Sequence, residues 1–167
     1  MSNGQTVKRP VLVEHQAGGD LSVARDVLAT EAAGLIALSS ALDQRFAEAV
    51  DLLAGASGRI VVSGMGKSGH VARKIAATMA STGTPALFVH PAEASHGDLG
   101  MIITGDAVLA LSNSGETAEL ADLVSHARRF GLPLVGITAA PGSALARASN
   151  VALILPPAPE EIGRAHV

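Results

Sequence analysis

The sequence predicts an α/β domain built on a parallel β-sheet. Five short apolar runs, β-branched in part, follow Gly58, and helical patterns or short helical turns separate most of them. Because these runs are continuously apolar, each strand is expected to be buried on both faces, as in a parallel sheet covered by helices. The expected strands are residues 60–62, 86–89, 108–111, 134–137 and 151–155.

Composition argues against several classes of function. The chain has 167 residues, enough for one domain with a real core, and 48% of them are hydrophobic. A net charge of −3, with no Tyr or Trp to stack on bases, gives no support for nucleic-acid binding. The absence of cysteine removes disulfides and thiolate chemistry and suits a cytoplasmic location. No apolar stretch approaches the roughly 20 residues of a membrane span, so we expect no membrane association.

The segment before the sheet is expected to be helical. Residues 1–19 look like a disordered tail, and the domain is expected to begin at Asp20, a plausible helix N-cap. From there to Gly55 no proline occurs, and apolar residues recur at helical spacing. This pattern fits either one long helix or two helices with a break near residues 39–40. Further helices are expected at 68–81, 117–130 and, as a shorter turn, 143–148.

Two turns that suit a phosphate group leave the expected strands about fifty residues apart. The first, from Ser63 to His70, reads SGMGKSGH, and the second, from Ser112 to Thr117, reads SNSGET. Both lead into helical patterns, where free backbone N–H groups and the helix dipole favour an anion. If the first and third strands are neighbours, as in the flavodoxin-like order, both turns line one crevice at the carboxyl edge of the sheet. The sequence therefore predicts a phosphorylated small-molecule ligand.

Other interpretations of these turns fit less well. GMGKSG has the glycine spacing of a dinucleotide-binding turn, but the acid that would bind a ribose is missing after the second strand, where Val89, His90 and Pro91 stand. GKS also imitates the end of a P-loop, but Val61 occupies the position of that motif's first glycine. The second turn read alone could simply cap a helix.

The segment between the turns is dense in groups that can carry protons. Two histidines, a glutamate and an aspartate occur within nine residues after the second strand, at His90, Glu93, His96 and Asp98. The position of His96 beside Gly97, between two strands that face the ligand, favours a functional role, whereas Asp98 is expected to cap a turn. The two histidines have no evident third partner, so a dedicated metal site is not expected.

These motifs resemble a known family. The run from Gly64 to Thr117 resembles the SIS (sugar isomerase) domain, and the segments GMGKSGH, ASTGTPALFVHPAEASHGDLGM and SNSGET are similar to the arabinose 5-phosphate isomerases. The resemblance implies a flavodoxin-like three-layer sandwich with a five-stranded parallel sheet over residues 20–160. It also implies interconversion of D-ribulose 5-phosphate and D-arabinose 5-phosphate through an enediol, ahead of Kdo and lipopolysaccharide synthesis. The alternative within the same fold is a non-catalytic regulatory domain that binds a phosphosugar.

The resemblance also implies roles for individual residues. Residues expected to be catalytic are Lys67, His96, Glu119 and Glu160, and His96 additionally matches a position that can bind an inhibitory metal. The phosphate is expected to lie against Ser68, Ser112, Asn113, Ser114 and Thr117. The rest of the pentose phosphate is expected to contact Gly83, Thr84, His90 and His96. The sites of the family form between subunits, so a homo-oligomer (dimer or tetramer) is implied, and the enediol chemistry requires no cofactor.

Reaction chemistry independently supports some of these roles. Moving a carbonyl group between C1 and C2 of a sugar needs a base that shuttles one proton, and a donor or cation for the developing oxyanion. Glu119 follows the second turn closely and is a reasonable base, although it could equally be an ordinary surface residue. Lys67 could offset negative charge on the phosphate or on the enediolate.

The chain departs from the family pattern at its end. After Glu160 the family continues with a closing helix, a further catalytic histidine and usually two CBS domains, whereas this chain has EIGRAHV. One back-translation of this heptapeptide resembles a sequencing-library adapter. We therefore expect residues 161–167 to be a non-native tail and the last helix of the domain to be missing, the alternative being a divergent short isoform. Missing cover over the last strand predicts an exposed apolar patch.

Overall fold

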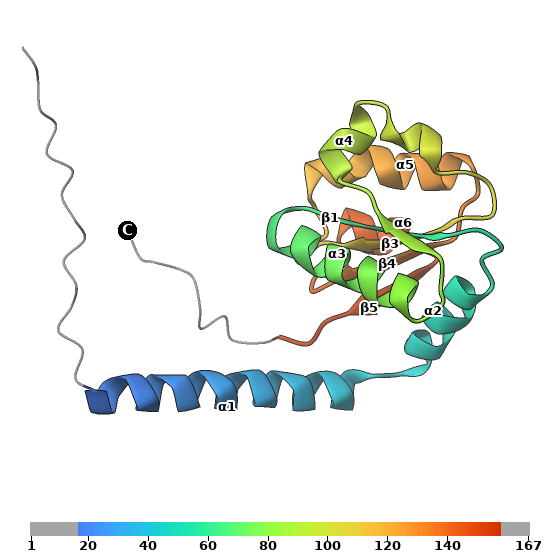
Figure 1. Ribbon diagram of the computed structural model, residues 1–167. Helices are drawn as coiled ribbons and strands as arrows, with labels where there is room; N and C mark the ends of the chain where they lie inside the picture. Colours follow the sequence, from blue (N-terminus) through green and yellow to red (C-terminus); the bar gives the residue numbers. More distant parts are fainter. Residues whose placement is uncertain (1–16, 158–167) are drawn as a thin grey trace, which may run out of the picture. The chain divides into compact units, whose positions relative to one another are not determined.

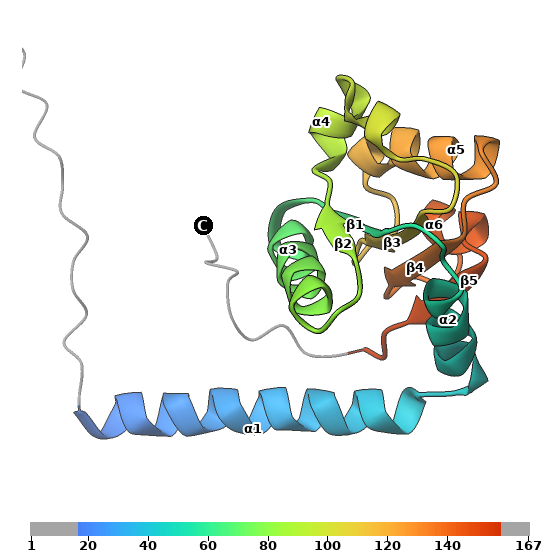
Figure 2. The same ribbon diagram turned by 45° about the vertical axis from the view of Figure 1, so that its right-hand side comes forward.

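The computed structural model describes residues 17–157, in the element order shown in Figures 1 and 2. These residues fall into two compact units. The first part of helix α1 (Ala17–Ala41), up to Ala37, belongs to one unit, and Leu38–Pro157 form the other. The second unit holds the β-sheet. None of the described helices is long and apolar enough to cross a membrane.

The helical segment before the sheet consists of two helices. α1 begins at Ala17, so the expectation that Asp20 caps it is wrong, and Asp20 lies inside its first turn. A carboxylate is favoured both at the cap and in the first turn, which is why composition alone did not separate the two positions. α2 (Gln44–Ala54) begins after Asp43, whose carboxylate accepts a hydrogen bond of 2.9 Å from the Arg45 N–H. The break therefore lies slightly beyond residues 39–40.

A five-stranded parallel sheet forms the centre of the Leu38–Pro157 unit. Its strand order is β2-β1-β3-β4-β5, which confirms the flavodoxin-like arrangement with β1 between β2 and β3. Each strand corresponds to one of the predicted apolar runs, with ends shifted by at most two residues. The strands are β1 (Ile60–Gly64), β2 (Ala86–Phe88), β3 (Ala107–Leu111), β4 (Leu134–Thr138) and β5 (Val151–Ile154).

Helices cover both faces of this sheet and make three layers (Figures 1 and 2). Along β1, Val61 belongs to one apolar cluster, whereas Ile60 and Val62 belong to the other. This alternation follows from the two-residue period of a strand, which points successive side chains to opposite faces. The first cluster lies against α4 (Pro91–Ser95), α5 (Ala121–Arg129) and α6 (Ala144–Ala148), and the second lies against α2 and α3 (Gly66–Ser81).

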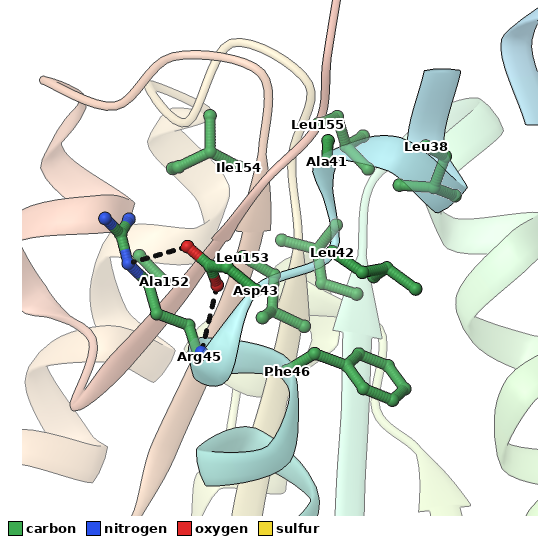
Figure 3. Close-up of a pocket in the computed structure, with 11 residues that line it drawn as sticks. Leu38, Ala41, Leu42, Asp43, Arg45, Phe46, Ala152, Leu153, Ile154 and Leu155 are labelled. Carbon is green, nitrogen blue, oxygen red and sulfur yellow. Dashed lines mark hydrogen bonds and ion pairs between the residues drawn. The ribbon is translucent and has the colours of Figure 1, made fainter. Parts of the chain in front are cut away.

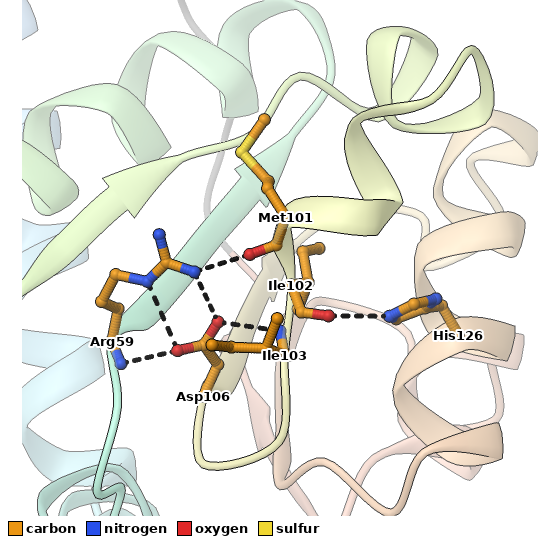
Figure 4. Close-up of polar contacts among 6 residues, drawn as sticks. All are labelled: Arg59, Met101, Ile102, Ile103, Asp106 and His126. Atoms are coloured by element: carbon orange, nitrogen blue, oxygen red, sulfur yellow. Dashed lines mark hydrogen bonds and ion pairs between the residues drawn. The ribbon is translucent and has the colours of Figure 1, made fainter.

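An ion pair joins the beginnings of β1 and β3 at the amino edge of the sheet (Figure 4). The Arg59 Nη2 atom lies 3.0 Å from Asp106 Oδ2, and the Arg59 backbone N–H donates to Asp106 Oδ1 at 2.8 Å. Burial raises the pKa of Asp106, but hydrogen bonds from Arg59 and from the Ile103 N–H, with the charge of Arg59, hold that pKa below its ordinary value. The carboxylate is therefore ionised in the folded chain at neutral pH.

The flank of β5 is less completely covered than the centre of the sheet. β1 and β3 are fully buried, whereas every residue of β5 is half-buried. An apolar groove of about 260 Å³ lies between β5 and the segment that begins α2, and Leu42 and Phe46 beside it are about half exposed (Figure 3). This agrees with the expected apolar patch at the last strand. Residues 158–167, on which the expected tail and Glu160 fall, lie outside the described residues.

Candidate functional site

The two turns begin side by side, as expected from the sequence if the first and third strands are neighbours. In the register of the sheet Gly64, the last residue of β1, pairs with Leu111, the last residue of β3. The chain leaves both strands at the carboxyl edge of the sheet, so the turn before α3 and the turn Ser112–Thr117 open onto the same edge. This edge is where open parallel sheets bind their ligands.

The first turn leaves the N-terminus of α3 uncapped. Met65 stands at the N-cap and offers no side-chain hydrogen bond, in contrast to Asp43 and Ser143, which cap α2 and α6. Because the first N–H groups of a helix have no partner within it, those of Gly66, Lys67 and Ser68 are available to an anion. The Lys67 side chain is exposed at this end of α3, and Ser68 is half-buried.

The second turn is closed by its own hydroxyl groups. Ser112 Oγ and Thr117 Oγ1 are hydrogen-bonded at 2.7 Å, and the Gly115 N–H donates to Ser112 Oγ at 3.0 Å. The buried Ser112 therefore shapes the turn from within. Asn113 and Ser114 are exposed at its tip, where Ser114 Oγ accepts a hydrogen bond of 3.2 Å from the Glu116 N–H.

The connection after β2 carries both histidines of the predicted site. The Ser63 hydroxyl donates to the Val89 carbonyl at 2.7 Å, which ties this connection to the end of β1. His90 precedes α4, packs edge-on against Phe88, and has a buried Nδ1 atom with no hydrogen-bond partner among the described residues. His96 is exposed directly after α4. A buried ring nitrogen without a partner is unusual, so His90 is suited to contact a ligand.

Two local expectations in this region need correction. Residues 117–130 do not form one helix: Glu119 lies in a 3-10 helix, η2 (Ala118–Leu120), and α5 begins only at Ala121. Asp98 does not cap a helix but is the first residue of η1 (Asp98–Met101), after Gly97. Tight 3-10 turns of this kind commonly adjoin helix ends and leave little mark on apolar spacing. Because α4 packs against η2, the histidine segment and the segment of Glu119 are neighbours.

Two further residues that were expected to contact the sugar, Gly83 and Thr84, do not lie at this edge of the sheet within one chain. Gly83 and Thr84 follow the C-terminal end of α3, a helix of 16 residues that is about 24 Å long. They therefore lie toward the amino edge of the sheet, far from the turn at the start of the same helix. Among residues 17–157 no three His, Asp or Glu side chains cluster closely enough to hold a metal ion.

Two residues that the sequence did not single out hold the second turn in place. Thr138, at the end of β4, donates through its hydroxyl to the Asn113 carbonyl at 3.1 Å. Glu116 Oε1 accepts a hydrogen bond of 2.8 Å from the Ala144 N–H at the start of α6. Glu116 stood within the SNSGET motif, but its spacing gave no sign of this contact. Thr138 carried no local signal at all.

Two curated proteins are similar to this chain over much of its length. Arabinose 5-phosphate isomerase KdsD from Shigella flexneri is 48% identical over 149 residues, which make up 89% of this chain and 45% of that protein. KdsD from Pseudomonas aeruginosa is 60% identical over 108 residues, 65% of this chain and 33% of that protein. The chain thus spans less than half the length of these two curated relatives.

A solved structure and a family match complete the comparison. An Escherichia coli protein in complex with arabinose 5-phosphate superposes with a TM-score of 0.77 at 36% identity, covering 85% of this chain and 76% of that chain. The SIS domain family matches residues 52–167. A parallel sheet with two hydroxyl-rich turns at its carboxyl edge, close sequence relatives and this family match lead to one conclusion: the chain belongs to the SIS domain family.

Proposed function

We propose that the chain is the isomerase portion of an enzyme that interconverts D-ribulose 5-phosphate and D-arabinose 5-phosphate. The observation that carries the proposal is the pairing of the Ser112–Thr117 turn with the uncapped N-terminus of α3 at one edge of the sheet. The 48–60% identity to KdsD proteins supports this choice of sugar phosphate.

The phosphate group would be held between the two turns. The first-turn N–H groups of α3 and the positive end of its dipole favour a dianion, and Lys67 adds a full positive charge. From the other side, the exposed Asn113 and Ser114 offer donors at the tip of the second turn. Ser112 and Thr117 would contribute mainly by closing that turn through their mutual hydrogen bond.

The isomerisation itself requires one proton to move between C1 and C2. From the ketose, a base removes a proton from C1 while O2 takes up a proton, which gives the enediol; O1 then loses its proton as C2 is protonated, which leaves the carbonyl group at C1. Glu119, His90 and His96 lie on the neighbouring segments η2 and α4 and are the candidates for this transfer. No electrons are exchanged with a cofactor, so the reaction needs no nicotinamide.

A complete site would require a second copy of the chain. Gly83 and Thr84 lie toward the amino edge of the sheet, about the length of α3 away from the phosphate turns. Both sets of residues can contact one pentose phosphate only if different copies supply them. We therefore include a homo-oligomer in the proposed function.

Binding of arabinose 5-phosphate by calorimetry tests the proposal. The double variant Ser114→Ala/Thr117→Val should weaken binding by about 1–3 kcal/mol, because it removes hydrogen bonds at and beneath a charged group. The matched control is Ser125→Ala/Thr78→Val, which makes the same two changes on exposed helical residues and should bind like the wild type. Unchanged affinity in the first variant would refute the phosphate site.

Turnover separates an enzyme from a sensor of the same fold. In deuterated water, arabinose 5-phosphate formed from ribulose 5-phosphate by the intact gene product should take up deuterium at C2 unless the proton is shielded from exchange. A strict requirement for NAD would refute the enediol mechanism. Tight binding without any turnover by the intact gene product would instead favour the phosphosugar-binding regulatory domain.

A further inference from the structure

The Ser112–Thr117 turn is anchored from behind by the connection between β4 and α6. The Asn113 carbonyl accepts hydrogen bonds from Thr138 Oγ1 at 3.1 Å and from the Ala139 N–H at 3.0 Å. The Gly115 carbonyl accepts a hydrogen bond of 3.0 Å from the Leu145 N–H. Two carbonyl groups of the turn are therefore directed toward β4 and α6.

This anchoring decides where the N–H groups of the turn point. A trans peptide group carries its C=O and N–H on opposite sides, so a carbonyl of Asn113 directed at β4 turns the Ser114 N–H away from β4. The Ser114 N–H donates to no atom of residues 17–157. It is thus free at the tip of the turn, where the proposed phosphate would lie.

Thr138 has the central place in this arrangement. Its side chain is completely buried, and its hydroxyl both donates to the Asn113 carbonyl and accepts a hydrogen bond of 3.2 Å from the Ala140 N–H. A buried hydroxyl with both of its roles filled has a fixed orientation. A Cβ atom added at Gly115 would lie 2.8 Å from Thr138 Oγ1, so the turn is pressed directly against this hydroxyl.

We propose that Thr138 is a positioning residue of the sugar-phosphate site, acting through its hydroxyl on the Asn113 carbonyl to aim the Ser114 N–H at the phosphate. The inference rests on the proposed function, because it assumes that this turn binds a phosphate group. Thr138 itself would not touch the ligand. Its contribution would appear in affinity, separately from its contribution to stability.

Two substitutions separate these contributions. Thr138→Val keeps the volume of the side chain and removes the hydroxyl, so the dissociation constant for arabinose 5-phosphate should rise by about two- to tenfold, the equivalent of one hydrogen bond. Thr138→Ser keeps the hydroxyl and leaves a methyl-sized void, so it should bind like the wild type. Both variants should melt below the wild type, the first because the Ala140 N–H loses its acceptor and the second because of the void.

The experiment is a titration of the 167-residue chain and both variants with arabinose 5-phosphate and, separately, with inorganic phosphate, alongside thermal melts. Should the valine variant fail to fold, Thr138→Ala replaces it in the same comparison with serine. Equal affinities of the valine (or alanine) and serine variants would overturn the role of Thr138. A wild-type chain that binds inorganic phosphate but not the sugar phosphate would refute the proposed substrate, while the phosphate titrations would still decide on Thr138. No binding of either probe would overturn both.

Discussion

At the scale of single residues, Gly115 is a position of the second turn that has no room for a side chain. Its φ of +65° lies in the left-handed region, and an added Cβ would meet Ser143 Oγ at 2.0 Å and Ser143 Cβ at 2.4 Å. Ser143 is buried and caps α6, so it has no free space into which to move. Gly66, in the first turn, has a similar φ of +57°, but an added Cβ there would meet nothing within 4 Å.

These two glycines form a matched pair for a stability measurement. Gly66→Ala should cost about 1–2 kcal/mol of unfolding free energy, because only the left-handed backbone is penalised. Gly115→Ala should cost about 3 kcal/mol or more, because overpacking against a buried side chain is added to the same penalty. Chemical denaturation measures both values. Equal losses would show that the space behind Gly115 can open without cost.

At the scale of elements, the Arg59–Asp106 pair ties the beginning of β1 to the loop that precedes β3. Asp106 is almost completely buried, and its carboxylate also accepts a hydrogen bond from the Ile103 N–H at 3.1 Å. The side chain of Arg59 reaches further to the Met101 carbonyl at 2.6 Å (Figure 4). One carboxylate therefore fixes the register of the two central strands relative to the loop between η1 and β3.

The lowered pKa of Asp106 predicts a pH dependence of stability. Because the pKa lies below the ordinary value of 3.8 in the folded chain, the ionised form stabilises the fold. This stabilisation is fully present above the ordinary value and is lost as the pH falls through the native one. Urea denaturation from neutral pH to about pH 2 should therefore show a steeper loss of stability for the wild type than for Asp106→Asn.

The same variant is also informative at neutral pH. Asp106→Asn should lower the unfolding free energy by about 1–3 kcal/mol there, because the charge-assisted hydrogen bonds from Arg59 are weakened. Asp51→Asn, a change of an exposed acid in α2, should keep the wild-type pH dependence. Parallel curves for Asp106→Asn and the wild type would contradict this account.

At the scale of the whole molecule, α1 presents an apolar stripe that needs a partner. Leu21, Leu28 and Leu35 recur every seven residues, so they share one face of the helix, and they are 55%, 64% and 69% exposed. A helix with a row of exposed leucines is expected to bury them against another surface. If the chain forms the proposed homo-oligomer, we expect a second copy to supply such a surface.

Replacing two leucines of this stripe with glutamate tests whether the stripe takes part in assembly. Leu28→Glu/Leu35→Glu should shift the chain toward the monomer in sedimentation velocity, because glutamates cannot be buried there unpaired. The control Ser22→Glu/Ala29→Glu has the same spacing and charge on exposed residues of a different face of α1, about 100–120° from Leu28. It should keep the wild-type oligomer. A wild-type distribution in both variants would show that the stripe takes no part in assembly.

Much of this fold could be predicted because its signals are local. Each strand is a short apolar run that needs cover on both faces, and this requirement alone predicted five parallel strands with helices between them. The two turns could be predicted because their signal is also local: glycine and hydroxyl residues follow directly at the ends of β1 and β3. The start of the first helix was predicted wrongly, because an aspartate is favoured both at the N-cap and in the first turn, and Asp20 lies in the first turn of α1.

What the sequence by itself determined is therefore the set of strands, their parallel nature and the position of two glycine- and hydroxyl-rich turns, since neighbouring residues suffice for each. Only the tertiary structure decided which groups hold the second turn and the ends of the central strands, because those contacts join distant parts of the chain. Thr138 reaches Asn113 across 25 positions, Glu116 reaches the start of α6 across 28, and Arg59 reaches Asp106 across 47. The separation of Gly83 and Thr84 from the phosphate turns also arises only when α3 is folded, because a helix converts 16 residues into a rigid span of about 24 Å.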